Sequence, residues 1–433
     1  MTSKHFNVKT FYILLFGQSI SLLGTGMTRF AVMIWAYEQT KSATALALLG
    51  FFNCLTYIIA SPFAGVFVDR WPRRRVMFLA DLSAGLTTIF LLITNLTGEL
   101  HLWHLYLAVG LAGIFEAFQE PAFTSTISLL LPKEDYTRSN GMLGLGKSAA
   151  RMFAPILAGL VQQTLGLNAV LGIDLITMTL ALFGLTLVRI PSVPVSVTGM
   201  EASEDTFWGQ LRFGAGYIFR HAGLRNLAIF HFLINLFGTL TYFAILSPMI
   251  LTRNNGDESV LGVVRLMMGV GGIMGGALIV AWKNPQRKAR MYLLATGLSF
   301  LICDALMAMS RSVYGWSAAG FLSELTIPLI VSPYIALWQE LIPPDVQGRV
   351  FSTREMIQIS SQPIGYLLGG LMADRIFEPA MLNYAWFQNS FGVLVGTGPG
   401  AGMSSMFLFT AIFGGLLGFG GLMIRSIRQL DEK

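Results

Sequence analysis

The sequence has few charged residues. Asp, Glu, Lys and Arg make up 12% of its 433 residues, whereas hydrophobic residues make up 54%. This charged share is about half that of a soluble globular protein, so the chain could not cover a water-exposed surface of this size. Its 46 glycines fit another environment, because glycine is frequent in membrane helices. The composition excludes a soluble protein and predicts a polytopic membrane protein.

Cysteine is scarce as well, and sites for covalent chemistry are missing from the sequence. The two cysteines, Cys54 and Cys303, lie inside apolar runs, which excludes a disulfide-stabilised scaffold and predicts two inert thiols. The sequence also lacks a phosphate-binding glycine loop, a cluster of metal ligands and a nucleophile with its base. We therefore expect no cofactor, no metal site and no catalytic centre.

Long apolar runs fill most of the chain. About 20 residues are needed to cross the hydrocarbon of a bilayer, and twelve runs are long enough. They cover residues 11–37, 43–68, 76–97, 102–127, 141–163, 167–188, 226–251, 260–282, 291–310, 314–339, 354–373 and 403–424. No small-residue cleavage site follows the first run, so it indicates a retained helix and not a signal peptide. The sequence predicts an all-α membrane protein with twelve transmembrane helices.

The basic residues predict the orientation of these helices. With the N-terminus in the cytoplasm, most of the 29 Lys and Arg residues fall in cytoplasmic segments. The outer loops hold only Lys41, Arg253, Arg311 and Arg375. Because cytoplasmic loops carry an excess of Lys and Arg, both termini are expected in the cytoplasm of a bacterial inner membrane protein. The positive net charge is then a topology signal and gives no support for nucleic acid as a partner.

Two halves of the chain repeat the same landmarks. Pro132 precedes Arg138 at the spacing at which Pro343 precedes Arg349, and Gly65 and Gly276 each precede a basic inner loop. Both pairs are separated by the same interval, near half the chain length. Repeated six-helix units are a transporter architecture, with the substrate bound near the midplane between the repeats.

The repeat and the composition between its copies predict three parts. These are an N-terminal six-helix bundle over 1–189, a cytoplasmic linker over 190–225 and a C-terminal six-helix bundle over 226–433. Apolar and aromatic residues recur at helical spacing near the end of the linker. They predict an amphipathic helix that lies in the membrane interface, or alternatively a regulatory docking helix.

The loop after the second predicted helix carries a specific motif. Gly65 is followed by Asp69-Arg70, Pro72 and Arg73-Arg74. This pattern resembles the signature of the major facilitator superfamily, with Pro72 where the family usually has glycine. The resemblance implies a cytoplasmic gating motif formed by Gly65, Asp69, Arg70, Arg73 and Arg74. It places Asp69 near the N-terminus of the eleventh helix, where an anion is favoured and where Ser352 and Thr353 could provide a cap.

Further segments resemble one branch of this superfamily, the bacterial drug–proton antiporters of the macrolide-efflux and siderophore-exporter type. They include Gly17-Gln18-Ser19, the run from Phe115 to Gln119 and the outer run from Val395 to Gly400. The small-residue motif of the fifth and eleventh helices resembles the family's antiporter motif. Its residues are Pro155, Gly159, Pro363, Gly369 and Gly370. Small residues also allow close helix packing without any transport role.

Ionisable residues inside hydrocarbon are costly and are therefore functional candidates. If the fourth and fifth helices are antiparallel about their loop, Glu116 lies level with Arg151 and Glu120 with Lys147. The resemblance also implies that the first helix lies between them, which makes Arg29 a competing partner for Glu116. The tenth helix carries Glu324, with no obvious cation in the adjoining sequence. We predict Glu324, Glu116 and Glu120 as proton-coupling candidates, with a purely structural charge ladder as the alternative.

His231 and Asn235 share a face of the seventh helix, which the resemblance places at the substrate cavity. They predict a substrate or proton site, or alternatively an internally hydrogen-bonded pair. The leading interpretation is a monomeric transporter that exports an apolar or amphipathic small molecule in exchange for protons. The alternatives are a dedicated exporter or flippase of a siderophore, lysolipid or sugar, and a non-transport membrane enzyme or transporter-like sensor.

Overall fold

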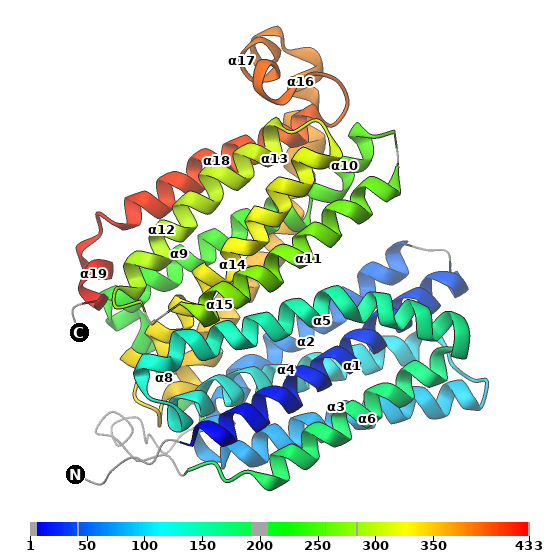
Figure 1. Cartoon of the computed structure of the whole chain (residues 1–433), viewed down its shortest axis with the longest axis vertical. Helices are drawn as coiled ribbons and strands as arrows, with labels where there is room; N and C mark the ends of the chain where they lie inside the picture. The colour runs from blue at the N-terminus through cyan, green and yellow to red at the C-terminus, as the bar shows by residue number, and fades with distance from the viewer. Residues whose placement is uncertain (1–6, 41–42, 192–206, 256, 283–284, 432–433) are drawn as a thin grey trace. The chain divides into compact units, whose positions relative to one another are not determined.

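The computed structural model describes residues 7–40, 43–191, 207–255, 257–282 and 285–431, and no β-strand occurs among them (Figure 1). The chain divides into two compact units. The first unit comprises Met1–Ile218 and Trp338–Met356, and the second comprises Phe219–Leu337 and Ile357–Lys433. The prediction of an all-α membrane protein is confirmed.

The first unit contains the helices that Figure 1 colours from blue to green, together with the start of α15. Its elements are α1 (Val8–Thr40), α2 (Ala43–Arg70), α3 (Arg73–Leu96), α4 (Leu102–Leu130), the 3-10 helix η1 (Lys133–Asp135), α5 (Tyr136–Leu165), α6 (Leu167–Leu187) and α8 (Phe207–Arg220). α2 packs on α4, α1 packs on α5 and α6, and α3 packs on α4 and α6. Buried aliphatic residues such as Val32, Leu105 and Leu171 form the core of this unit.

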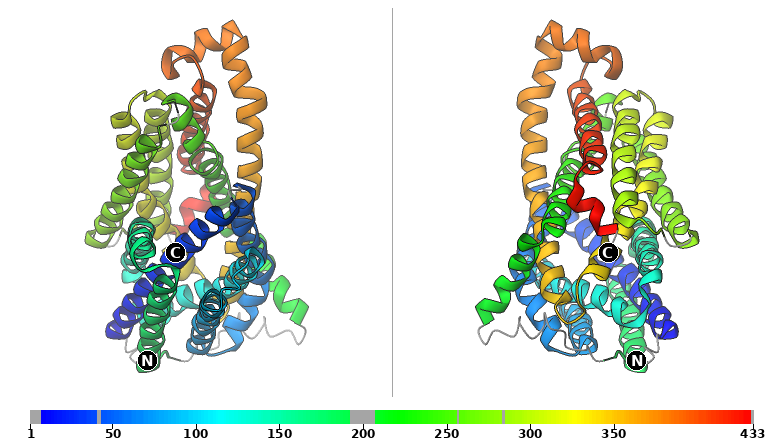
Figure 2. Two further views of the ribbon diagram at one scale, coloured as in Figure 1. Left: turned by 90° about the vertical axis from the view of Figure 1, so that its right-hand side faces the viewer. Right: turned by 90° about the vertical axis from the view of Figure 1, so that its left-hand side faces the viewer.

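The second unit contains several helices that are interrupted by π-helical turns. Its elements are α9 (Ala222–Gly238), η2 (Thr239–Phe243), α10 (Leu246–Arg253), α11 (Glu258–Ala281), α12 (Lys288–Leu298), η3 (Ser299–Asp304), α13 (Ala305–Met309), α14 (Val313–Leu341), α15 (Gln347–Met372, which begins in the first unit), η4 (Ala373–Phe377), α16 (Glu378–Asn383), α17 (Ala385–Val395), α18 (Ala401–Gly421), α19 (Arg425–Arg428) and the 3-10 helix η5 (Gln429–Asp431). Trp316 and Phe407 are fully buried in its core. Both views of Figure 2 show α16 and α17 at the end of this unit to which α15 leads.

Ten described helical segments are long and apolar enough to cross a membrane. α5 and α15, with 30 and 26 residues, occupy the two remaining predicted spans but carry more polar residues. The eleventh predicted span, about 354–373, falls almost wholly within α15, which begins earlier, at Gln347. Its first two turns are polar, and an apolar-run criterion therefore misses them.

The linker is described only in part, because residues 192–206 lie outside the described residues. α8 occupies the place of the predicted amphipathic helix. It packs on the start of α15: a Cβ on Gly214 would lie 2.5 Å from the carbonyl oxygen of Arg349, and the Arg349 guanidinium lies 4.9 Å from the centre of the Phe213 ring. α8 therefore has a protein-facing side, and its location in the membrane interface stays a prediction.

Candidate functional site

Asp69, in the last turn of α2, binds the first turn of α15. Its Oδ1 accepts the backbone N–H of Gly348 at 2.7 Å, and its Oδ2 accepts the backbone N–H of Arg349 at 3.0 Å. The Arg349 Nε donates to the same Oδ2 at 2.9 Å. The first N–H groups of a helix have no partner within the helix, and a carboxylate there also gains from the helix dipole. Asp69 therefore caps α15 from outside and forms an ion pair with it.

This cap corrects the expectation for Ser352 and Thr353. Since α15 begins at Gln347, both residues lie inside the helix. The Thr353 hydroxyl donates to the carbonyl oxygen of Arg349 at 2.9 Å, within the helix. The Ser352 carbonyl oxygen accepts a hydrogen bond of 3.0 Å from the Ser61 hydroxyl of α2. The carboxylate of Asp69, which the family resemblance places near this helix end, provides the cap in their place.

Two glycines allow α2 and α15 to approach at this point. A Cβ on Gly65 would lie 2.8 Å from the Cα of Arg349, and a Cβ on Gly348 would lie 2.8 Å from the carbonyl oxygen of Gly65. Real Cβ atoms essentially never show contacts this close. A larger residue at either position would therefore separate the helices and lengthen the hydrogen bonds of Asp69.

The arginines of the motif reach different partners. Arg73 is buried and donates to the carbonyl oxygens of Ser125, at 2.5 Å, and of Pro344. Arg74 donates to the carbonyl oxygen of Thr186 at 2.7 Å. Arg70 is exposed. The structure thus brings Gly65, Asp69 and Arg73 together around the start of α15, whereas Arg74 reaches the end of α6.

A buried amide cluster next to this contact escaped the sequence analysis. The Asn140 amide donates to Gln339 Oε1 at 2.7 Å, and the Gln339 amide donates to the carbonyl oxygen of Thr124 at 2.8 Å. Gln347 donates to the carbonyl oxygens of Gln339 and Ile342 at 3.1 and 2.9 Å. Polar uncharged residues near helix ends carry no distinctive sequence signal, so only the fold shows this cluster.

Glu116 forms an ion pair with Arg29 of α1. Asn53 of α2 also donates to its Oε2 at 3.4 Å. The predicted pairing of Glu116 with Arg151 is wrong: Arg151 is exposed, and no described ion pair includes it. The reason is that α1 packs along α5 and brings Arg29 to Glu116, whereas the reflection considered only helices consecutive in the chain.

Glu120 pairs with Lys147 as the reflection predicted, with 2.6 Å between Oε1 and Nζ. It also has an electrostatic interaction with Arg354 in the second turn of α15. Arg354 is buried and forms an ion pair of 2.8 Å with Glu355. Neither Arg354 nor Glu355 is a predicted site residue, because both lie at the predicted start of the eleventh span.

Glu324 of α14 is half-buried and interacts electrostatically with Arg265 of α11. The adjoining sequence indeed offers no such cation, because Arg265 comes from another helix that packs against α14. A Cβ on Gly271 or Gly275 would lie 2.2 Å from the carbonyl oxygen of Phe321 or Leu325, so these glycines bring α11 directly against α14. Arg265 also donates to the Ser247 hydroxyl at 3.0 Å.

His231 is enclosed by aromatic residues of its own unit. Its ring stacks on Tyr334 with 3.8 Å between centroids, and its Nδ1 lies 3.3 Å from the Tyr292 hydroxyl. Asn235 donates to the His231 carbonyl oxygen at 2.8 Å, so the pair is linked through the backbone. Contact of His231 with a substrate stays a prediction and would require this buried cluster to open.

Some residues of the small-residue motif lie against a neighbouring helix, and others face open space. A Cβ on Gly369 would lie 2.7 Å from the Ala244 Cβ, so Gly369 packs closely. A Cβ on Gly159 or Gly370 would meet nothing within 4 Å, and Pro363 is exposed. Pro155 lies inside α5, which continues through it as one helix. Close packing therefore explains Gly369 but not the whole motif.

Three buried aspartates are surrounded by neutral donors. Asp174 accepts from the hydroxyls of Thr25, Thr28 and Thr88 at 3.2, 2.9 and 2.9 Å. Asp81 accepts from the amides of Gln18, at 2.9 Å, and Gln119. Asp304 accepts from the hydroxyls of Tyr242 and Thr410 at 2.9 and 2.7 Å. The described residues contain no group of three or more His, Cys, Asp and Glu that could hold a metal ion.

The family model of the Major Facilitator Superfamily matches residues 14–366. The chain belongs to this superfamily. Macrolide efflux protein A of Streptococcus pyogenes is 28% identical over 375 residues, which cover 84% of this chain and 90% of that protein. Multidrug efflux pump Tap of Mycolicibacterium fortuitum is 23% identical over 378 residues, which cover 84% and 88%.

Solved structures of the superfamily share the fold. The crystal structure of a bacterial homologue of the iron transporter ferroportin, in an outward-facing state, matches with a TM-score of 0.69. The match covers 96% of this chain and 100% of that chain at 17% identity. The chain is accordingly a multi-pass membrane protein with the fold of a major facilitator.

The contact between Asp69 and α15 predicts a large stability loss in Asp69→Ala. The variant removes both backbone acceptors and leaves the guanidinium of Arg349, 9% exposed, without this carboxylate. Breaking a buried ion pair costs about 3–5 kcal/mol, and Asp69→Asn, which keeps an acceptor oxygen, loses less. Thermal unfolding in detergent measures the difference. Glu134→Gln, at an exposed acid of η1, is the control, and an equal melting temperature in Asp69→Ala would contradict the assignment.

The pairing of Glu116 with Arg29 predicts coupling between substitutions at these two positions. In a double-mutant cycle with Glu116→Gln and Arg29→Gln, the double variant should be more stable than the sum of the singles implies, by at least about 0.5 kcal/mol. Arg151→Gln should change stability by less than about 0.5 kcal/mol, as at other exposed sites. Additive effects at 29 and 116, or coupling of 116 with 151, would show that the pairing is wrong.

Proposed function

We propose that this transporter exports apolar or amphipathic small molecules across the inner membrane in exchange for protons, by alternating access. The support for the substrate class comes from relatives named for macrolide efflux and multidrug efflux. Their identities lie below 30%, so these names support a class of substrate and no single compound. Both termini are assigned to the cytoplasm, on the distribution of Lys and Arg.

The observation that carries proton coupling is a carboxylate with a cationic neighbour inside each unit. Glu116 pairs with Arg29 in the first unit, and Glu324 interacts with Arg265 in the second. Burial favours the protonated form of a carboxyl, whereas a nearby cation favours the ionised form. A proton that binds the carboxylate therefore weakens its hold on the arginine, and proton binding becomes linked to the packing of the helices that carry the pair.

The carboxylates differ in their suitability as proton carriers. Glu120 has both Lys147 and Arg354 as neighbours, which favours a structural role. Glu324 lies on a half-buried face of α14 with Arg265 on the adjacent helix. We assign the proton site to Glu324 first and to Glu116 second.

The contact between Asp69 and α15 is assigned to the cytoplasmic latch that the family motif implies. Its hydrogen bonds hold the first turn of α15, a helix that continues from the first unit into the second. A helix held at its first turn by three hydrogen bonds cannot shift until they break. In this proposal they form in one state of the transport cycle and break in the other.

An efflux-deficient bacterial host tests the transport proposal. Expression of the chain should raise resistance to several macrolide-like and cationic amphipathic compounds and lower the accumulation of a fluorescent dye. A protonophore should remove both effects, because the pump would lose its energy source. The empty vector is the control. Protection that survives the protonophore would refute proton coupling, and protection against a single compound would favour a dedicated exporter.

Glu324→Gln tests the proton site. The glutamine keeps the size of the side chain but cannot take up a proton, so substrate flux driven by an imposed pH gradient in proteoliposomes should be abolished. Expression and elution from a sizing column should remain normal. Glu99→Gln, at an exposed position between α3 and α4, is the matched control. Unchanged proton-driven flux in Glu324→Gln would rule out this assignment.

A further inference from the structure

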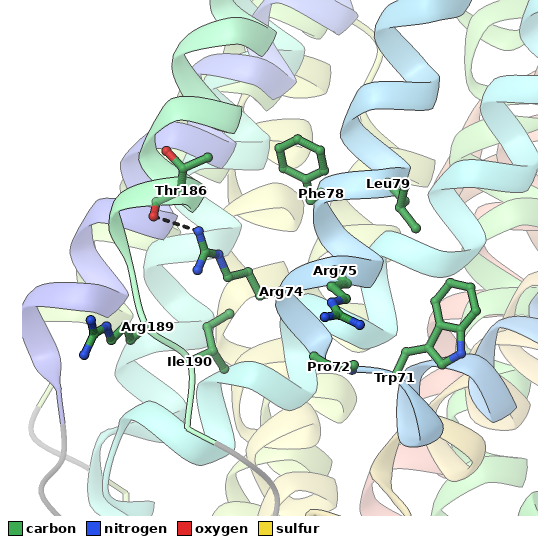
Figure 3. Close-up of a pocket in the computed structure, with 9 residues that line it drawn as sticks. All are labelled: Trp71, Pro72, Arg74, Arg75, Phe78, Leu79, Thr186, Arg189 and Ile190. Atoms are coloured by element: carbon green, nitrogen blue, oxygen red, sulfur yellow. Dashed lines mark hydrogen bonds between the residues drawn. The ribbon is translucent and has the colours of Figure 1, made fainter.

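A pocket of about 760 Å³ lies in the first unit, where α3 begins and α6 ends (Figure 3). It is lined by Trp71, Pro72, Arg74, Arg75, Phe78, Leu79, Thr186, Arg189 and Ile190. Arg74 spans the gap between the two helices and donates to the carbonyl oxygen of Thr186 (Figure 3). None of the nine lining residues is acidic.

The pocket lies at the ends of two apolar segments, and membrane-spanning helices end where hydrocarbon meets headgroups. The apolar segments Arg73–Leu96 and Leu167–Leu187 begin and end beside it. α3 and α6 pack antiparallel from here to their far ends, where the Asn95 amide donates to Asn168 Oδ1 at 2.7 Å. Large apolar side chains next to the pocket point outward: Phe183 is 61% exposed and Leu187 is 64% exposed. On a membrane-spanning bundle such side chains face lipid.

Among the described residues, no acidic side chain pairs with the arginines of the pocket. The guanidinium groups of Arg75 and Arg189 have no hydrogen bond or ion pair with a described residue, whereas that of Arg74 donates to the carbonyl oxygen of Thr186. Three guanidinium groups around one cavity repel each other and would gain from an anion. Guanidinium groups also bind phosphate oxygens through two parallel N–H donors. The pocket therefore favours a phosphate group.

The remaining lining residues favour an amphiphile over a free anion. Trp71, 46% exposed, and Leu79, 45% exposed, form an apolar wall beside the arginines. Tryptophan is typical of the membrane interface, where its ring lies at the headgroup level. Basic pockets between membrane helices on the cytoplasmic side bind anionic headgroups. Soluble phosphate would use the arginines but leave this apolar wall in water.

We propose that this pocket binds the headgroup of an anionic phospholipid from the surrounding leaflet, with the phosphate on Arg74, Arg75 and Arg189 and the acyl chains along α3 and α6. The lipid would link the start of α3, next to the latch motif, to the end of α6. This site is independent of the transported substrate and of the coupling ion.

Retention of phosphatidylglycerol by the purified protein tests the site. Arg75→Gln with Arg189→Gln removes two charges without touching the Arg74 hydrogen bond. The matched control is Arg425→Gln with Arg428→Gln, two exposed arginines of α19. Native mass spectrometry should show that wild type and control retain phosphatidylglycerol in preference to phosphatidylcholine. The pocket variant should lose at least about tenfold of this preference, since each basic residue contributes several-fold near an anionic surface.

Two further experiments distinguish lipid binding from the binding of free phosphate, and loss of the site from misfolding of the variant. Inorganic phosphate should displace phosphatidylglycerol only weakly. If phosphate displaced the bound lipid as effectively as added phosphatidylglycerol does, a soluble anion would be the ligand and the proposal would be overturned.

If the pocket variant does not fold, phosphatidylglycerol brominated in its acyl chains tests the native chain by quenching Trp71. The fluorescence quenching that is lost in Trp71→Phe reports on Trp71. This loss should be larger with brominated phosphatidylglycerol than with brominated phosphatidylcholine. Equal quenching, or equal lipid loss in the α19 control, would refute the site.

Discussion

Hydrocarbon does not solvate an ionised side chain, and this constraint accounts for most polar contacts inside the described helices. A helix satisfies the hydrogen bonds of its own backbone. The polar and charged side chains must still find partners within the protein. Glu116 and Glu120 lie beside cations, whereas Asp174 is surrounded by threonine hydroxyls. The two solutions have different consequences. A carboxylate in a direct ion pair can exchange its cation for a proton. Asp174 has an electrostatic interaction with Arg29 as well, but its hydrogen-bond donors among the described residues are three neutral hydroxyls that stay in place. The same constraint therefore separates candidates for coupling from candidates for stability.

A carboxylate at a helix N-terminus recurs as a structural device. Asp69 binds the first N–H groups of α15. Glu378 accepts the backbone N–H of Met403 at 2.8 Å near the start of α18. Asp431 accepts the N–H groups of Ala289 and Arg290, at 2.7 and 3.0 Å, at the start of α12. Burial raises the pKa of Asp431 above its ordinary value, and these two hydrogen bonds oppose that shift. Each cap comes from another element, so it completes a helix and joins two elements at once.

The features that could be predicted from the sequence are those that depend on local composition and spacing. Apolar runs locate the membrane helices, and the glycine and charge spacing of the loop after α2 indicates the family. Reflecting consecutive helices gave the wrong partner for Glu116, because the pairing depends on α1 packing along α5; the competing partner, Arg29, is the one that the structure shows. The neighbour of Glu324 depends on Gly271 and Gly275 bringing α11 against α14. The start of α15 was missed because its polar first turns are stabilised by Asp69, a residue far away in the chain. Tertiary contacts decide all three.

The distance along the chain between Asp69 and its acceptor helix has a consequence for biosynthesis. Gly348 follows Asp69 by 279 residues. At roughly 5–20 residues per second, a ribosome needs on the order of 14–56 s to make that stretch. During this interval α2 is already synthesised, but its terminal carboxylate lacks the backbone donors of α15 and relies on interfacial water. Newly made chains therefore pass through a stage in which this end of the first unit is incomplete. The motif that marks the mature family fold is thus also among the last contacts that a growing chain can form.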